Sequence, residues 1–358
     1  MVSVCATTPM NKVYDVVIVG GGLSGVTLAH EIQKNLPVYS WNLLEARPTL
    51  GGRLVNDKKG NRIDLGGAWI WPASQPKIKK LIKSLGLSTF MQPDDPSSTR
   101  IDGGAVAVVE KLANKLPAAN IRLNTPVTKC TLQTGSNSTS IRLDIASGHV
   151  LAKCVVVAVP PKLVDKHIVF DPPLSRAKQA AMNASHTWMA GVTKVSLVYE
   201  NKFWNEQISN MGLPQRLPGP AFQVYDASTK DRSINAMTFF CLVPPGSPAK
   251  SDNAVLADQV TAQISSVWKL YTGSDFREEV RKYKDVHVQH WPAEQYISED
   301  SNPKQIHSHP HPVGALSTTE WDDRLHFAGS ETDRQSPGVI EGAVGAALRV
   351  AQELKAKK

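Results

Sequence analysis

Apolar runs and amphipathic segments alternate near both ends of the chain, a pattern typical of α/β proteins. Residues 14–20 form a short run of mostly apolar, β-branched side chains, as expected of a buried parallel strand. Residues 26–35 then predict a helix, and residues 38–44 predict a second strand. Close to the C-terminus, a strand over 324–328 is followed by a turn and a helix over 339–354. Both ends therefore predict strand–turn–helix units.

The middle of the chain predicts a second group of strands. They are expected near 192–199, 222–226 and 234–242. Two segments rich in Pro and Gly, 213–220 and 244–252, are expected to form loops of that sheet. The length of 358 residues, at about 150 residues per domain, also favours two domains.

A glycine motif joins the first predicted strand to the first helix. It reads Gly20-Gly21-Gly22-Leu23-Ser24-Gly25, a GxGxxG pattern in its strand–turn–helix context. Gly20 permits the tight turn, Gly22 lets the backbone approach a pyrophosphate, and Gly25 lets the helix pack close to the strand. Glu45 follows the second strand, where its carboxylate can accept hydrogen bonds from an adenosine ribose. The segment therefore predicts a dinucleotide site at a helix N-terminus.

Two further glycine pairs bear on which dinucleotide binds. Gly51-Gly52-Arg53 is a turn that carries a cation suited to a pyrophosphate, and Gly66-Gly67-Ala68-Trp69 places a glycine pair beside an aromatic ring. The GxGxxG motif alone does not distinguish NAD from FAD. Two glycine pairs with an arginine between them favour a large, embedded cofactor over a nicotinamide that must dissociate.

Composition and charge exclude several protein classes. The net charge is +8, but Lys and Arg are spread along the chain, which favours a solvated surface over nucleic-acid binding. Cys5, Cys130, Cys154 and Cys241 lack the spacing of a metal site, which favours a reducing compartment. No apolar run approaches the about 18 residues of a membrane span, and residues 1–12 do not resemble a secretory signal. We therefore expect a cytoplasmic protein.

A series of motifs resembles the flavin-dependent amine oxidase family, which includes monoamine and polyamine oxidases. The motifs lie, in order, at 17–25, 44–47, 51–53, 64–69, 155–161, 170–174, 327–332 and 338–343. The resemblance implies an α/β fold, in which a Rossmann-like FAD-binding domain is interleaved with a smaller mixed-sheet (α+β) substrate domain. The FAD-binding domain would comprise 11–88, 104–183 and 294–358, and the substrate domain 89–103 and 184–293.

The resemblance also implies which residues contact FAD. They are Gly20, Gly22, Leu23, Ser24, Gly25, Glu45, Ala46, Arg47, Gly52, Arg53, Gly67, Ala68, Trp69, Val127, Gly329, Glu331, Val339 and Ile340. Val127 resembles the strand residue whose backbone pairs with adenine, and Glu331 and Thr332 match residues that line the ribityl chain and pyrophosphate. The helix that begins at Val339 would direct its N-terminus at the flavin ring and stabilise the reduced, anionic form.

Lys194 is the candidate catalytic residue. It lies in 191–199, an otherwise apolar segment, where burying a lysine is costly unless the ammonium group has a partner. The resemblance implies that Lys194 holds a water against the flavin N5 atom. The alternative is a strand residue whose side chain reaches solvent along the surface.

The chain departs from the family pattern where the substrate cavity is expected. Family members carry a long helical insertion over that cavity, but here only a short segment with a loop-like stretch at 93–98 joins Leu87 to Gly103. We therefore expect an open site, or one covered by a second copy or a partner chain. The paired aromatic residues beside the flavin are also missing, since one position matches Val339 and the other falls near Asp300 or Ser301. No cysteine lies near Asp300, so FAD is expected to bind non-covalently.

Three residues are candidates for substrate contact. Trp71 lies where polyamine oxidases often carry a histidine, which disfavours that subgroup. His307 and His309 belong to an alternating histidine segment that ends at His311. Such a segment can bind metal, but its prolines and lack of nearby acidic residues favour a loop without metal. The family match puts this loop near the flavin, where His307 or His309 would contact substrate.

The resemblance implies an FAD-dependent oxidase. It would remove hydride from a carbon beside nitrogen, giving an imine, and O2 would reoxidise the flavin with release of hydrogen peroxide. Two alternatives stay open: an FAD-dependent desaturase or oxidase of a bulky non-amine substrate, and a non-catalytic flavin-binding subunit. The expected partners are therefore O2 and a small amine or bulky organic substrate, without nucleic acid or a membrane span.

Overall fold

Two compact units make up the chain in the computed structural model, which describes residues 12–135, 138–204, 213, 218–244, 246–250, 252–298 and 309–357. Unit 1 comprises Met1–Gly52, Val108–Thr187 and His309–Lys358, and unit 2 comprises Arg53–Ala107 and Trp188–Ser308. The unit boundaries differ from the predicted domain boundaries, because residues 53–88 belong to the same compact unit as the second group of strands. The predicted division into FAD-binding and substrate-binding segments concerns function, and it stays a prediction.

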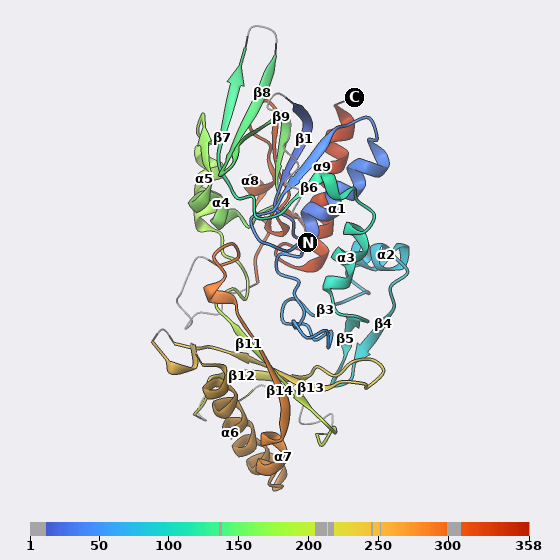
Figure 1. Cartoon of the computed structure of the whole chain (residues 1–358), viewed down its shortest axis with the longest axis vertical. Coiled ribbons are helices and arrows are strands. Elements are labelled where there is room, and N and C mark those ends of the chain that lie inside the picture. The colour runs from blue at the N-terminus through green and yellow to red at the C-terminus, as the bar shows by residue number, and fades with distance from the viewer. Residues whose placement is uncertain are drawn as a thin grey trace. The chain divides into compact units, whose positions relative to one another are not determined.

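Unit 1 is built on an eight-stranded sheet with the order β10-β7-β8-β9-β1-β2-β6, in which β15 also pairs with β9 (Figure 1). The strands are β1 (Val13–Val19), β2 (Trp41–Leu44), β6 (Ile121–Arg122), β7 (Val127–Thr134), β8 (Thr139–Ile145), β9 (Gly148–Val157), β10 (Val169–Asp171) and β15 (Leu325–Phe327). β1 pairs in parallel with both β2 and β9, and β15 pairs in parallel with β9. The α/β class and the Rossmann-like sheet are therefore confirmed.

Helices flank this sheet. They are α1 (Leu23–Asn35), α4 (Pro161–His167), α5 (Arg176–Ala184), α8 (Gly314–Ser317) and α9 (Ile340–Ala356), while α3 (Val106–Ala113) contains a unit boundary. α1 packs against α9 beside the parallel strands (Figure 1). The apolar run of β1 is explained by burial on both faces, since Val16 to Val19 are all buried. The strand–turn–helix predictions at both ends of the chain are confirmed.

Unit 2 contains a four-stranded antiparallel sheet with the order β12-β13-β11-β14. The strands are β11 (Thr193–Tyr199), β12 (Ala221–Asp226), β13 (Asn235–Cys241) and β14 (Tyr283–His290), and the helices are α6 (Asn253–Thr272) and α7 (Arg277–Arg281). The three strands predicted for this region are confirmed, with every described pair antiparallel where a mixed sheet was predicted. An apolar core beneath the sheet includes Trp268 of α6. Most of the loop predicted at 213–220 lies outside the described residues, and the loop at 244–252 contains a short 3-10 turn at Pro248–Lys250.

A second, three-stranded sheet of unit 2 corrects one prediction. Its order is β3-β5-β4, with β3 (Trp69–Ile70), β4 (Thr89–Gln92) and β5 (Asp95–Ile101), and α2 (Pro76–Ser84) precedes β4. The stretch 93–98 was predicted to be a loop, which is wrong from Asp95 onward. The hydroxyls of Ser97 and Ser98 donate to the Asp95 carboxylate, so a polar sequence that resembles a turn is satisfied within an antiparallel hairpin.

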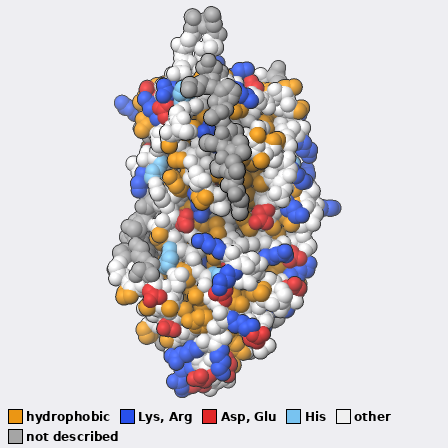
Figure 2. All heavy atoms as spheres, viewed as in Figure 1, with side chains coloured by type: hydrophobic (Ala, Val, Ile, Leu, Met, Phe, Trp, Pro, Cys, Tyr) orange, Lys and Arg blue, Asp and Glu red, His pale blue; other side chains and the backbone are white. Residues whose placement is uncertain are grey.

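The described helices do not include one with the length and apolar character needed to cross a membrane. On the face shown in Figure 2, Lys and Arg side chains are interspersed with Asp and Glu side chains.

Candidate active site

The glycine motif forms a tight turn in unit 1 between β1 and α1. Gly20 has a φ of +107°, and a Cβ added there would lie 2.8 Å from the Ala158 carbonyl oxygen. A Cβ at Gly25 would overlap the Gly20 carbonyl, so the helix can pack this close to the strand only with glycine at that position. The physical reasons given for both glycines therefore hold in the structure.

Gly22 has few neighbours on the side where a Cβ would lie, as a backbone that approaches a pyrophosphate requires. A Cβ added there would meet only the Gly52 Cα atom, at 3.9 Å. The second glycine turn lies alongside, because the Gly51 N–H donates to the Gly21 carbonyl at 2.9 Å. Gly22 is also the N-cap of α1, and as a glycine it has no side chain to cap the first N–H groups of that helix. These features fit the pyrophosphate of FAD, which would bind along Gly22 and Gly52 at the positive end of α1.

Glu45 connects the two glycine turns. Its buried carboxylate accepts the Gly21 N–H at 2.5 Å and the Arg47 N–H at 2.8 Å, while the Arg47 side chain donates to the Gly52 carbonyl at 2.8 Å. Ala46 between them is half-buried. The sequence did not predict this structural role of Glu45. A carboxylate has acceptor capacity beyond these two bonds, so the predicted ribose contact is compatible with the geometry.

The C-terminal strand–turn–helix of unit 1 contacts the start of α1, next to the glycine turn. The Ser24 hydroxyl donates to the Ala328 carbonyl, so the hydroxyl of Ser24 fixes α1 to the segment after β15. Gly329 packs against the Val159 carbonyl, since a Cβ added at Gly329 would lie 2.6 Å from that carbonyl oxygen. Glu331 is buried in the following turn. Val339 is the N-cap of α9, as predicted for a helix beginning there.

The remaining predicted cofactor residues are distributed over both units. Leu23 and Ile340 are the first residues of α1 and α9, and Val127 is the buried first residue of β7, all in unit 1. Arg53, Gly67, Ala68 and Trp69 belong to unit 2.

Lys194 lies on β11 of the four-stranded sheet of unit 2, a strand whose seven residues are all buried. Its side chain is only 4% exposed, so the alternative in which it reaches solvent is wrong. The ammonium nitrogen lies 2.5 Å from the Gly66 carbonyl oxygen, 3.5 Å from that of Asp64 and 3.4 Å from the Tyr225 hydroxyl. The Phe240 ring centroid is 4.7 Å away. Burial lowers the pKa of Lys194 to about 7, although Asp64 opposes this effect.

The segment that accepts the Lys194 hydrogen bond is the third glycine motif. A Cβ at Gly66 would overlap the Arg53 carbonyl, and the Gly67 N–H donates to that carbonyl at 3.2 Å. Gly67 is exposed between the buried residues Gly66 and Ala68. Its backbone therefore offers an accessible, side-chain-free surface next to the carbonyl that binds Lys194.

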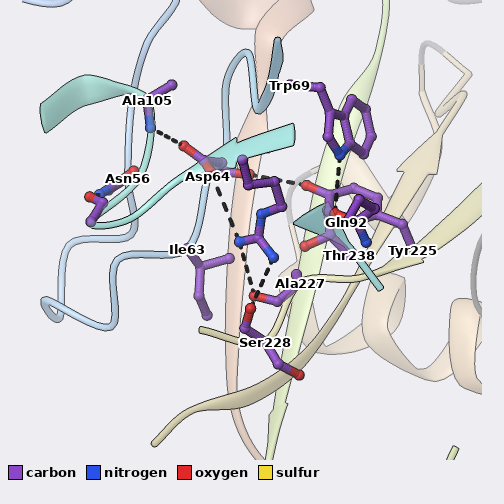
Figure 3. Close-up of polar contacts among 12 residues, drawn as sticks. Asn56, Ile63, Asp64, Trp69, Gln92, Ala105, Tyr225, Ala227, Ser228 and Thr238 are labelled. Atoms are coloured by element: carbon purple, nitrogen blue, oxygen red, sulfur yellow. Dashed lines mark hydrogen bonds and ion pairs between the residues drawn. The ribbon is translucent and has the colours of Figure 1, made fainter. Parts of the chain in front are cut away.

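The Trp69 ring packs against the rings of Tyr225 and Phe240. Its indole N–H donates to the Gln92 side-chain oxygen at 3.1 Å (Figure 3). Its ring meets the Tyr225 ring edge-on, with centroids 4.6 Å apart, and lies 5.9 Å from the Phe240 ring. Lys194 is thus surrounded by rings from three elements.

Sequence reasoning missed the buried pair Asp64 and Arg100. One Asp64 oxygen accepts the Ala105 N–H at 2.7 Å (Figure 3), and the other lies 3.9 Å from an Arg100 guanidinium nitrogen. Burial raises the pKa of Asp64 to about 6. Asp64 was visible in the motif at 64–69, but Arg100 stands in a polar segment with nothing in the local pattern to mark it.

The candidate substrate residues are not brought together by any described contact. Trp71 is half-buried in unit 2, and its backbone N–H donates to the Gln75 side-chain oxygen at 3.0 Å. His309 is exposed in unit 1, 3.0 Å from the Pro310 carbonyl oxygen. His307, with Asp300 and Ser301, lies outside the described residues. No group of three or more potential metal-ligating side chains occurs in the described part of the chain.

Comparison with known proteins agrees with this geometry. Residues 90–355 match the profile of flavin containing amine oxidoreductases, and residues 18–85 match that of an NAD(P)-binding Rossmann-like domain. The chain is 43% identical over 81 residues to amine oxidase [flavin-containing] A of Equus caballus, which covers 22% of this chain and 14% of that protein. It is 27% identical over 271 residues to the probable flavin-containing monoamine oxidase A of Dictyostelium discoideum, covering 72% of this chain and 53% of that protein.

Two solved structures share the fold. A putrescine oxidase bound to putrescine superposes with a TM-score of 0.73 at 19% identity, covering 96% of this chain and 99% of that one. A cyclohexylamine oxidase from Brevibacterium oxydans superposes with a TM-score of 0.72 at 16% identity, covering 96% and 100%.

Proposed function

The chain belongs to the family of flavin containing amine oxidoreductases, and we propose that it oxidises a small amine with O2 as electron acceptor. The C–H bond beside nitrogen and one N–H bond are lost, so the amine becomes an imine. The two electrons and two protons pass to O2, which becomes hydrogen peroxide. The cofactor of the family is FAD, which supplies the two-electron acceptor when bound.

The protein's own contribution begins with binding the dinucleotide. Gly22 and Gly52 lack the side chains that would obstruct the pyrophosphate. Glu45 binds the first glycine turn and Arg47, and the Arg47 side chain binds the second turn. We propose non-covalent binding, because burial raises the pKa of Cys130 and of Cys154 to about 12. Burial raises that of Cys241 still further, so none of the three described thiols is a ready nucleophile at neutral pH.

The environment of Lys194 carries the proposal for the reaction. A buried amine whose pKa lies near 7 can exchange a proton under physiological conditions, whereas a solvent-exposed lysine is almost always charged. Its proposed role is to hold a water at the flavin. The nearby rings of Trp69, Tyr225 and Phe240 exclude other water and leave the Gly67 backbone accessible.

The substrate class is tested by anaerobic titration of the flavin. Purified, FAD-loaded protein would be mixed with primary and secondary amines, including diamines and cyclic amines, while the flavin absorbance is followed. Bleaching by at least one amine, followed by peroxide release on admission of O2, is the expected result. If no amine bleaches the flavin, the proposed reaction is wrong.

We further propose that the substrate site is open to a second copy or another chain. The short β4–β5 hairpin stands where the family resemblance implies a long insertion. The molar mass of FAD-loaded protein by light scattering, alone and in extracts of its source, tests this. A monomer with full amine turnover would contradict the need for a covering chain.

A further inference from the structure

Unit 2 buries three charged side chains that come from three different segments. Asp64 precedes β3, Arg100 belongs to β5 and Lys194 belongs to β11. They are 1%, 2% and 4% exposed. One buried carboxylate therefore lies near two buried cationic side chains. When all three groups are charged, the single anion cannot offset the cost of burying both cations.

The geometry decides which cation takes the carboxylate. The second Asp64 oxygen is 3.9 Å from the Arg100 guanidinium, and among the described residues it has no hydrogen-bond partner. Arg100 is fixed there because its nitrogens also donate to the carbonyls of Asp226, Ala227 and Ser228, at 3.4, 3.3 and 2.9 Å. A guanidinium keeps its proton at any pH that a folded protein tolerates.

Among the residues that the structure describes, Lys194 has no comparable anionic partner. The acceptors found for its ammonium group are the carbonyls of Gly66 and Asp64 and the Tyr225 hydroxyl. Carbonyl dipoles stabilise the charged ammonium less than a carboxylate oxygen would, and a hydroxyl can also donate to a neutral amine.

The groups packed around Lys194 can be assigned element by element. They are Asp64, Gly66 and Trp69 from the segment that leads into β3, Arg100 from β5, Tyr225 from β12, Phe240 from β13, and the strand neighbour Gln289 from β14. Burial raises the pKa of Tyr225, which therefore stays neutral. Within the described part of the chain, Asp64 and Arg100 are the two charged groups that act on Lys194.

We infer that Arg100 neutralises the charge of Asp64 and that Lys194 is the group of the three that titrates. The Asp64–Arg100 pair then sets the pH range over which Lys194 changes charge. Arg100 and Asp64 are positioning residues, since they act through Lys194. The consequence for amine oxidation rests on the proposed function, but the charge arrangement itself does not. The direction of the Lys194 pKa shift, in which burial and Arg100 act together against Asp64, agrees with this arrangement.

The titration of Lys194 can be measured without turnover. In FAD-loaded protein with isotope-labelled lysine, the side-chain Cε resonance would be followed by NMR across the pH range, and assigned by its loss in Lys194→Met. Asp64→Asn removes the anion and should lower the Lys194 pKa by about one unit or more. Arg100→Gln releases the Asp64 carboxylate for Lys194 and should raise the Lys194 pKa by a similar amount.

The opposite signs separate charge from structural damage. Loosening of the core would admit water and raise the Lys194 pKa toward its ordinary value in both variants. Arg232→Gln is the matched control, because Arg232 pairs with Asp226 at 3.1 Å and leaves the Asp64 pair intact. It should leave the Lys194 titration unchanged. Arg100→Lys retains the cation and should also preserve it.

The decisive result is the one for Asp64→Asn. An unchanged or raised Lys194 pKa in that variant overturns the inference, even if Arg100→Gln fails to fold. The pH profile of flavin reduction by an amine should move with the NMR titration in each variant. If no amine reduces the flavin, the proposed function fails while the NMR result still decides the inference.

Discussion

Among the described residues, each unit buries one lysine that donates to backbone carbonyls, and the two lysines differ in what else surrounds them. Lys178 of α5, in unit 1, is 0% exposed and donates to the carbonyls of Leu316 and Thr318, at 3.1 and 2.6 Å. Its ammonium also lies 4.0 Å from the centroid of the Phe327 ring. Lys194 of unit 2 has a similar set of carbonyl and ring contacts.

The difference lies in the neighbouring charges. Lys178 joins α5 to the end of α8, and burial lowers its pKa to about 8, opposed chiefly by the half-buried Glu320. Lys194 instead lies near a fully buried carboxylate, that of Asp64, which is paired with an arginine. Burial and carbonyl contacts are thus common to Lys178, which connects two helices, and to Lys194, which we propose acts in the reaction. The two lysines differ in how deeply the neighbouring cation is buried, since Arg100 near Lys194 is buried and Arg349 near Lys178 is half-buried.

The largest expected difference between the two lysines is in flavin reduction. Lys194→Met should slow anaerobic reduction by an amine about 100-fold or more, because an acid–base group is lost. Lys178→Met should leave that rate unchanged within about threefold, since Lys178 binds helix ends. Stopped-flow absorbance of both FAD-loaded variants measures this. Equal rates in the two variants would end the assignment of Lys194 to the mechanism.

The pH dependence of stability should separate the two lysines next. A lysine whose pKa is lowered in the folded state binds its proton more weakly there, so the unfolded state holds more protons above the folded pKa. Stability should therefore rise with pH, from about 7 for Lys194 and from about 8 for Lys178, up to the unfolded value of about 10.4. Each contributes at most about 1.4 kcal/mol per pH unit.

Urea unfolding of FAD-saturated protein at a series of pH values tests this. Lys194→Met should flatten the pH dependence from about pH 7 upward, and Lys178→Met only from about pH 8 upward. The order of the two onsets is the critical observation. A reversed order would mean that burial in unit 2 does not lower the Lys194 pKa below that of Lys178.

The sequence marked Lys194 but not Lys178, and the reason is physical. Lys194 interrupts an apolar strand, so its burial is visible in the local pattern. Lys178 lies in a helix of mixed polar and apolar residues, where a lysine interrupts no apolar run. Its burial arises from contacts with a segment more than 100 positions away, as the separation of 138 residues to Leu316 indicates. Arg100 is hidden for the same reason, because the carbonyls that hold it belong to Asp226, Ala227 and Ser228.

Backbone-built features were easier to predict. The turn from β1 to α1 was predictable because only glycine fits the close contact at Gly25, so the sequence records the geometry directly. The β4–β5 hairpin was not, because Asp95 and its serines satisfy one another as well in a strand as in a loop.

The smallest expected effect compares the two carboxylates. Glu320 is only half-buried and accepts the Ser175 hydroxyl at 2.6 Å, so solvent screens its field at Lys178. Glu320→Gln should therefore lower the Lys178 pKa by less than about half a unit, against about one unit or more for Lys194 in Asp64→Asn. The same labelled-lysine NMR experiment reports both, with the Lys178 resonance assigned by its loss in Lys178→Met. Equal shifts would show that burial of the carboxylate does not control its coupling to lysine, and the contrast between the two units would then rest on Arg100 alone.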